Sequence, residues 1–88
     1  MVYRLRISRR ADKQLSKLDP HVSRIIATWL LKNVDGTDDP RRHGKGLTGP
    51  LSGRWRYRVG DYRILCAIED DKLIVLAVEV GHRSAVYR

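Results

Sequence analysis

The chain has 88 residues, and its 18 Lys and Arg against 10 Asp and Glu give a formal net charge of +8. This length suits a single domain, residues 1–88, and 42% hydrophobic residues are typical of a globular rather than a disordered chain. The excess of cations favours a polyanionic partner, either a nucleic acid or an acidic protein. No apolar run approaches the length of a membrane span, so we expect no membrane partner.

The single cysteine and the three histidines argue against two kinds of site. Cys66 stands alone in an apolar run, which predicts a buried thiol in the reducing cytoplasm rather than a disulfide. His21, His43 and His82 lack the spacing of metal ligands. We therefore expect neither a metal nor any other cofactor.

Two helices are predicted after a first strand. Residues 2–7 alternate in polarity, as a half-buried strand does. Ser8 is a plausible N-cap for a helix to about Leu18, and Asp19-Pro20 starts a second helix to about Val34. The short break between them predicts a helical hairpin. The buried stripe of the second helix is predicted to contain Val22, Ile25, Ile26, Trp29 and Leu30.

The second half of the chain predicts a long loop followed by three strands. Residues 37–52 are rich in turn formers and basic side chains, so they form either a functional loop or a plain linker. Residues 54–59, 62–69 and 73–80 are predicted strands, and the last is apolar on both faces except at Glu79. The order β-α-α-β-β-β predicts an α+β domain: a twisted antiparallel sheet of about four strands with the helical hairpin packed on one face.

The predicted strand at residues 54–59 gives the main indication of function. Arg54, Arg56 and Arg58 alternate with apolar residues, so three guanidinium groups lie about 7 Å apart along one face. Arginine binds phosphate through two parallel donors, which suits a nucleic-acid backbone, although an exposed strand also uses arginine for solubility. The first helix adds a second basic surface, so the predicted nucleic-acid-binding residues are Arg9, Arg10, Lys13, Lys17, Lys45 and Arg54.

Three motifs give the chain a resemblance to a known family. They are the basic helix at Arg10–Leu18, the segment Leu51–Ile64 that contains Trp-Arg-Tyr-Arg-Val-Gly-Asp-Tyr-Arg-Ile, and the ending Val-Gly-His-Arg-x-x-Val-Tyr at Val80–Tyr87. With them the chain is similar to the RelE-type toxins of the RelE/ParE superfamily. The resemblance implies a RelE-like fold and a cytoplasmic enzyme that cleaves mRNA in the ribosomal A site. It also implies ribosomal RNA and mRNA as partners, and neutralisation by a RelB-like antitoxin.

The resemblance also implies the site. Carried over residue by residue, the catalytic residues are Arg56, Arg58, Arg63, Arg83 and Tyr87. Some family members have lysine where this chain has Arg56 and Arg58, and arginine cannot act as a base. Metal-free attack by a ribose 2′-OH on the adjacent phosphate then needs another proton acceptor, for which His82, Tyr87 or a group supplied by the ribosome are candidates. Two alternatives stay open: a ParE-like toxin that binds DNA gyrase without chemistry, and a basic adaptor that only binds RNA.

Overall fold

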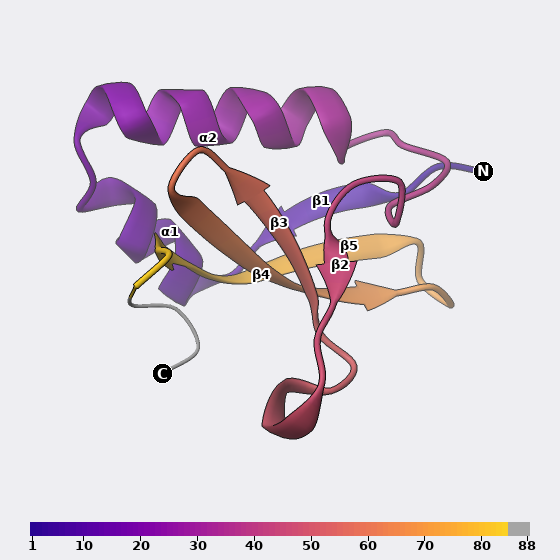
Figure 1. The fold of residues 1–88 in the computed structure, drawn as a ribbon. Coiled ribbons are helices and arrows are strands. Elements are labelled where there is room, and N and C mark those ends of the chain that lie inside the picture. The colour runs from indigo at the N-terminus through magenta and orange to yellow at the C-terminus, as the bar shows by residue number, and fades with distance from the viewer. Residues whose placement is uncertain (85–88) are drawn as a thin grey trace.

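The computed structural model describes residues 1–84, so Tyr87 lies outside the described residues. The elements are β1 (Arg4–Ile7), α1 (Arg9–Ser16), α2 (Pro20–Asn33), β2 (Lys45–Gly46), the 3₁₀-helix η1 (Gly49–Leu51), β3 (Trp55–Val59), β4 (Tyr62–Glu69) and β5 (Ile74–His82). The described strands form one sheet in the order β1-β5-β4-β3-β2 (Figure 1). The predicted α+β class and the order of the main elements are confirmed.

The sheet differs from the prediction in two respects. It has five strands rather than about four, because the loop before β3 contributes the two-residue strand β2. It is also mixed rather than antiparallel, since β1 runs parallel to β5. Both strands start at the end of the sheet where the β4–β5 turn lies, and the N–H of Arg4 donates to the carbonyl of Leu73 at 2.8 Å.

The helices begin where the sequence predicts. The hydroxyl of Ser8 accepts from the N–H of Ala11 at 3.0 Å, and the carboxylate of Asp19 accepts from the N–H of His21 at 2.8 Å. These bonds satisfy donors that the first turn of a helix leaves without partners. They fix the position of each helix relative to the strand or turn before it.

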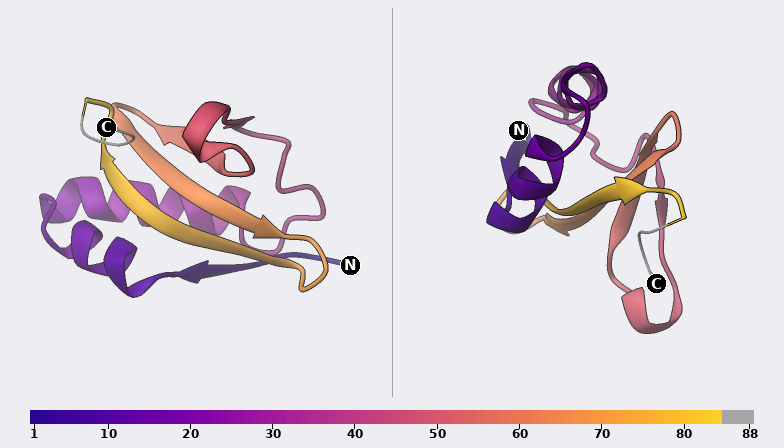
Figure 2. Two further views of the ribbon diagram at one scale, coloured as in Figure 1. Left: turned by 90° about the horizontal axis from the view of Figure 1, so that it is seen from below. Right: turned by 90° about the vertical axis from the view of Figure 1, so that its left-hand side faces the viewer.

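The two helices cover different parts of the sheet (Figures 1 and 2). Helix α2 crosses one face, where its Ile26 and Leu30 join the buried core with Tyr57 and Ile64. Helix α1 packs beside β5 beyond the end of β1, and the N–H of Val80 donates to the side-chain oxygen of Gln14 at 2.7 Å. This bond satisfies a backbone donor at a strand edge that β1 does not reach.

The predicted buried stripe of α2 is wrong at Ile25. The residue is 48% exposed, whereas Ile26 is 1% exposed. One step along a helix turns the side chain by about 100°, so only one of two successive residues can face the sheet fully.

A β-bulge in β5 decides which face of the sheet its last residues occupy. Ala77 pairs with Cys66 and Glu79 pairs with Leu65, so Val78 is an extra residue with no opposite partner. The hydroxyl of Ser8 donates to the carbonyl of Val78 at 3.2 Å. A bulge of this kind reverses the alternation of side chains beyond it. As a result Glu79 faces away from the buried core while Val80 faces it.

No helix within residues 1–84 combines the length and the apolar character that a membrane crossing requires.

Candidate functional site

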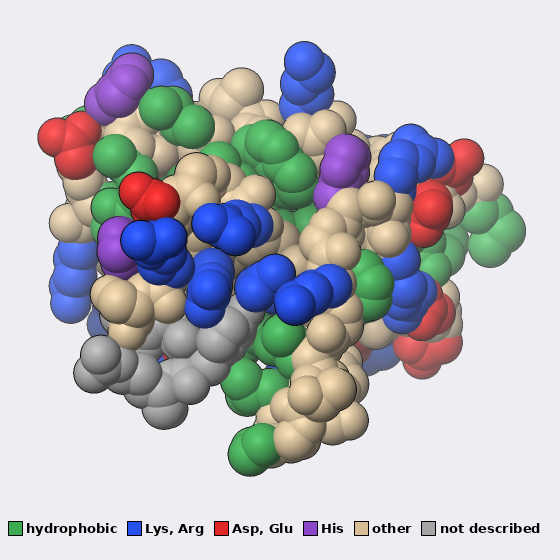
Figure 3. Space-filling model, viewed as in Figure 1, with side chains coloured by type: hydrophobic (Ala, Val, Ile, Leu, Met, Phe, Trp, Pro, Cys, Tyr) green, Lys and Arg blue, Asp and Glu red, His purple; other side chains and the backbone are tan. Residues whose placement is uncertain are grey.

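The face of the sheet opposite α2 carries a basic surface built from cross-strand pairs. Lys45 on β2 lies opposite Arg56 on β3, and Arg58 on β3 lies opposite Arg63 on β4. Directly opposite residues of an antiparallel pair point to the same face with their Cβ atoms about 5 Å apart. Tyr57 and Val59 are buried on the other face, which confirms the predicted alternation. Figure 3 shows Lys and Arg side chains in a row across the middle of the molecule, below α2.

Two like-charge pairs side by side are unfavourable for the fold itself. Cations directly opposite each other destabilise a strand pair, by a few tenths of a kcal/mol to about 1 kcal/mol. A polyanion bound across Lys45, Arg56, Arg58 and Arg63 converts this repulsion into attraction. The arrangement is therefore suited to binding phosphate.

Backbone hydrogen bonds hold Arg83 at the end of this surface where Arg63 lies. Its N–H donates to the carbonyl of Asp61 at 2.8 Å, and its carbonyl accepts from the guanidinium of Arg63 at 3.2 Å. Three of the predicted catalytic arginines, Arg56, Arg58 and Arg63, thus share one face, and Arg83 is fixed beside Arg63. The Nε of Arg56 is buried and finds no hydrogen-bond partner among the described residues. Such a buried donor is suited to a ligand or to bound water.

The row of residues through Arg56 extends across the sheet to α1. Leu65 lies opposite Arg56, Glu79 lies opposite Leu65, and Glu79 forms an ion pair of 2.9 Å with Arg10. The predicted basic residues of α1 gather with Gln14 around one shallow hollow; they are Arg9, Arg10, Lys13 and Lys17. Of these four, Arg10 is partly neutralised by its carboxylate partner, and the other three lie exposed.

His82 is not brought to the arginine face. It lies opposite Tyr62, whose side chain is on the α2 side of the sheet, and the two rings meet edge to face with centroids 5.6 Å apart. The Nδ1 atom of His82 also accepts from the N–H of Ser84 at 3.3 Å. The other predicted proton-transfer residue, Tyr87, lies beyond the residues that the structure describes.

The loop before β2 is fastened to the sheet, so it is not a plain linker. The indole N–H of Trp55 donates to the carbonyl of His43 at 2.8 Å, and the hydroxyl of Tyr57 donates to the carbonyl of Pro40. Burial raises the pKa of Tyr57 above its ordinary value, which keeps the hydroxyl protonated as a donor. These bonds hold the segment that places Lys45 opposite Arg56.

An ion pair completes this attachment. Arg41 donates two hydrogen bonds of 2.9 Å to Asp70, and the hydroxyl of Tyr3 donates to the same carboxylate at 2.5 Å. The bonds from Arg41, and then the bond from Tyr3, lower the pKa of Asp70 to about 2. The guanidinium of Arg41 also lies 6.0 Å from the ring centroid of Trp55, at cation–π distance.

Gly44 was not predicted as part of the site, yet it determines where β2 lies. Its φ is +81°, and a Cβ atom there would lie 2.2 Å from the carbonyl oxygen of Arg56 and 2.8 Å from the indole nitrogen of Trp55. The sequence signal is the Gly-Lys-Gly triplet at residues 44–46, in which glycine on both sides of Lys45 allows close backbone approach.

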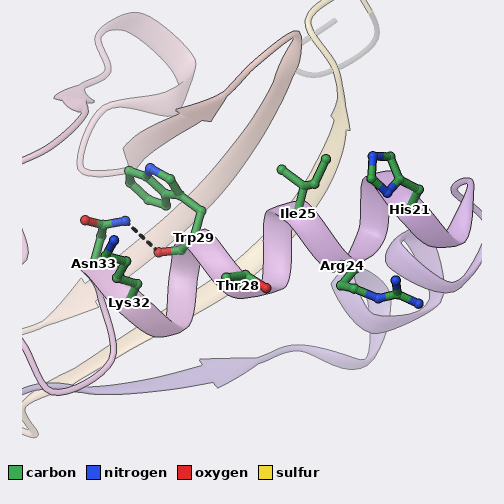
Figure 4. A pocket seen from close by; sticks show the side chains of 7 residues that line it. All are labelled: His21, Arg24, Ile25, Thr28, Trp29, Lys32 and Asn33. Carbon is green, nitrogen blue, oxygen red and sulfur yellow. Dashed lines mark hydrogen bonds between the residues drawn. The ribbon is translucent and has the colours of Figure 1, made fainter.

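A separate hollow lies along α2, away from the arginine face. Figure 4 shows that helix α2 supplies all of its lining residues: His21, Arg24, Ile25, Thr28, Trp29, Lys32 and Asn33. The amide of Asn33 donates to the carbonyl of Trp29 at 2.9 Å, so it bonds within the helix. Within the described part of the chain, no three His, Cys, Asp or Glu side chains gather as metal ligands would.

This small α+β domain has the fold of toxins whose structures have been solved. Residues 5–87 match the family described as the ParE toxin of the type II toxin-antitoxin system parDE. The chain therefore belongs to this family, within the RelE/ParE superfamily, and is a toxin of a type II toxin–antitoxin module.

Individual relatives cover nearly the whole chain. Toxin RelG of Mycobacterium tuberculosis is 32% identical over 88 residues, which are 100% of this chain and 99% of RelG. The toxin–antitoxin complex RelBE2 of the same organism contains a chain with a TM-score of 0.85 and 32% identity, and the match covers 96% of this chain and 95% of that one. A double mutant of the Escherichia coli toxin RelE in the free state matches with a TM-score of 0.75 and 26% identity, over 98% of this chain and 88% of that one.

Proposed function

We propose that the protein is a ribosome-dependent mRNA interferase, an endoribonuclease that cleaves mRNA in the ribosomal A site. The observation that carries the proposal is the juxtaposition of Lys45 with Arg56 and of Arg58 with Arg63 on one face. Cleavage by the adjacent 2′-OH builds negative charge on a pentacoordinate phosphate, and fixed guanidinium groups stabilise that charge without having to reorganise.

Each residue of the proposed site has a separate task. Arg56, Arg58 and Arg63 neutralise the phosphate, and Arg83 contacts it from the end of the sheet. Tyr87 is retained in the site as a C-terminal group that stacks on a base or transfers a proton. Lys45, Arg54 and the basic residues of α1 bind the ribosomal RNA and mRNA backbone without reading bases. The reaction as proposed uses no metal or other cofactor and takes place in the cytoplasm, where ribosomes are found.

A RelB-like antitoxin is the proposed regulatory partner. The RelBE2 structure is that of a toxin–antitoxin complex, and the chain carries a net charge of +8. An acidic, partly apolar segment laid over the basic face would neutralise it and block access to RNA. Co-expression with an adjacent small acidic reading frame should restore growth and co-purify both chains.

The test of the main proposal is cleavage on translating ribosomes. Purified protein is added to ribosomes programmed with a defined mRNA, and cleavage is mapped by primer extension. We expect cuts within the A-site codon and none in the same mRNA without ribosomes. The second candidate function, inhibition of DNA gyrase, is suggested by the ParE description of the matched family. Inhibition of gyrase supercoiling without any mRNA cleavage would select it instead.

A further inference from the structure

Glu79 is a carboxylate that lies beside the arginines of the basic face. The bulge at Val78 turns it to this face, opposite Leu65 and diagonal to Arg63. Diagonal neighbours on antiparallel strands lie about 7–8 Å apart, and residues two strands apart, such as Glu79 and Arg56, lie about 10 Å apart. A ribose phosphate held by the arginines would therefore lie within reach of this carboxylate.

Arg10 holds the carboxylate in place. Its guanidinium lies 2.9 Å from Oε1 of Glu79, whose side chain is only 23% exposed. No other ion pair or hydrogen bond of this carboxylate is found within residues 1–84. Because β5 and the packed helix α1 supply the two partners, the position of the carboxylate is set by rigid elements.

The other side chains on the arginine face are poorer proton acceptors. Arginine cannot lose its proton in a protein, and a lysine ammonium must lose its own proton before it can take another. His82 lies on the opposite face against Tyr62. A carboxylate is already a base at neutral pH. The basic face also contains Glu69, but it lies at the far end of β4, beside Lys72 at 3.5 Å.

We propose that Glu79 accepts the proton of the attacking 2′-OH and that Arg10 is its positioning residue. This inference rests on the proposed function. One oxygen of Glu79 takes the 2′-OH proton while the 2′-O–P bond forms and the P–O5′ bond breaks. The leaving 5′ oxygen takes a proton from water, and Glu79 returns its proton to the hydroxide that remains. The products are a 2′,3′-cyclic phosphate and a 5′-hydroxyl end.

The charged groups around Glu79 come from every element packed against it. They are Arg10 from α1, Arg6 on β1, Arg63 on β4 and Arg56 one strand further, and Lys13 lines the same hollow as Arg10. Guanidinium groups stay protonated at every pH used, and a lysine ammonium loses its proton only well above neutral pH. A fall of the cleavage rate at acidic pH that is lost when Glu79 is replaced would therefore report on the carboxylate of Glu79 itself.

The test compares Glu79→Gln with the parent in single-turnover cleavage on saturating programmed ribosomes. Loss of a general base costs about 10²–10⁴ in rate, so we expect a loss in this range, and the fall of the rate at acidic pH should be lost with it. Ribosome affinity should stay the same or rise, because the substitution removes a negative charge from a cationic face. Glu79→Asp should recover part of the rate. Glu69→Gln, the same substitution at the far end of the same face, should change nothing.

A structural role for the ion pair predicts a different result. If Glu79 only fastens α1 to β5, Arg10→Gln and Glu79→Gln should lose the same melting temperature and the same activity, and that outcome would overturn the inference. Under the inference, Arg10→Gln retains the base and loses less cleavage than Glu79→Gln. If the parent cleaves mRNA and the Glu79→Gln variant cleaves it at the same rate, this inference alone is overturned. If the parent does not cleave mRNA at all, the proposed function is overturned as well.

Discussion

Replacing Gly44 by alanine should destabilise the protein more than its unusual backbone angle alone explains. Both Gly44 and Gly36 have φ of +81°, but a Cβ atom at Gly36 meets nothing within 4 Å. Each substitution places an L-residue in the left-handed region, at a cost of about 1–2 kcal/mol. At Gly44 the added carbon would also collide with the carbonyl of Arg56 and the indole nitrogen of Trp55.

The additional cost at Gly44 can be worked from the contacts that must move. Relief of the collision separates the loop from β3 and loses the Trp55–His43 hydrogen bond of 2.8 Å. That bond and one further strand-pairing bond are worth about 1 kcal/mol each, so Gly44→Ala should cost about 2 kcal/mol more than Gly36→Ala. For a domain of this size the difference corresponds to roughly 8–16 °C in melting temperature.

The assay is thermal unfolding of the two variants and the parent at one protein concentration, followed by ribosome-dependent cleavage at a temperature where all are folded. Gly44→Ala should also cleave more slowly, because Lys45 and Arg56 are displaced together. Equal melting temperatures for the two variants would refute the claim that close backbone approach at Gly44 positions the site.

Three further outcomes follow. Arg83→Ala should slow cleavage by about 10²–10³. The melting temperature should change little, because only the backbone groups of Arg83 bond within the fold and its side chain is exposed. An unchanged cleavage rate would exclude Arg83 from the site. Asp70→Asn should lower the melting temperature at pH 5–7 relative to the parent. Because the folded state lowers the pKa of Asp70 to about 2, the difference in melting temperature should vanish as the pH falls through that pKa. A difference in melting temperature that is independent of pH would contradict this cause. Cys66 should resist alkylation at pH 8 until denaturant is added, since it is 0% exposed and burial raises the pKa of its thiol to about 12; rapid labelling of the folded protein would show that the core is open there.

Much of the fold was predictable because local chemistry determines it. The alternation of Arg56 and Arg58 with Tyr57 and Val59 is a property of any strand, and these residues occupy the predicted faces. Ser8 and Asp19 cap the helices through bonds to residues two or three positions away. Such contacts need no knowledge of distant parts of the chain.

The rest depends on contacts between residues far apart in sequence. Parallel pairing of β1 with β5 joins Arg4 to Ile74, which no periodicity reveals. The bulge at Val78 reverses the faces of the following residues, so strict alternation from the apolar part of β5 places Glu79 and His82 on the wrong sides. Strand β2 exists because glycine lets a loop approach β3 closely. For these reasons the common face of the strand arginines could be predicted from the sequence, whereas the surroundings of His82 and Glu79 could not.

The central claim, that this toxin cleaves mRNA by attack of the 2′-OH, is tested most directly by removing that hydroxyl. Programmed ribosomes are prepared with an mRNA that carries a single 2′-deoxy nucleotide on the 5′ side of the bond that the protein cuts in the all-RNA control. We predict that cleavage at this bond stops, while the control yields a 2′,3′-cyclic phosphate and a 5′-hydroxyl end. Cleavage of the deoxy-substituted mRNA at the same bond and rate would contradict the account.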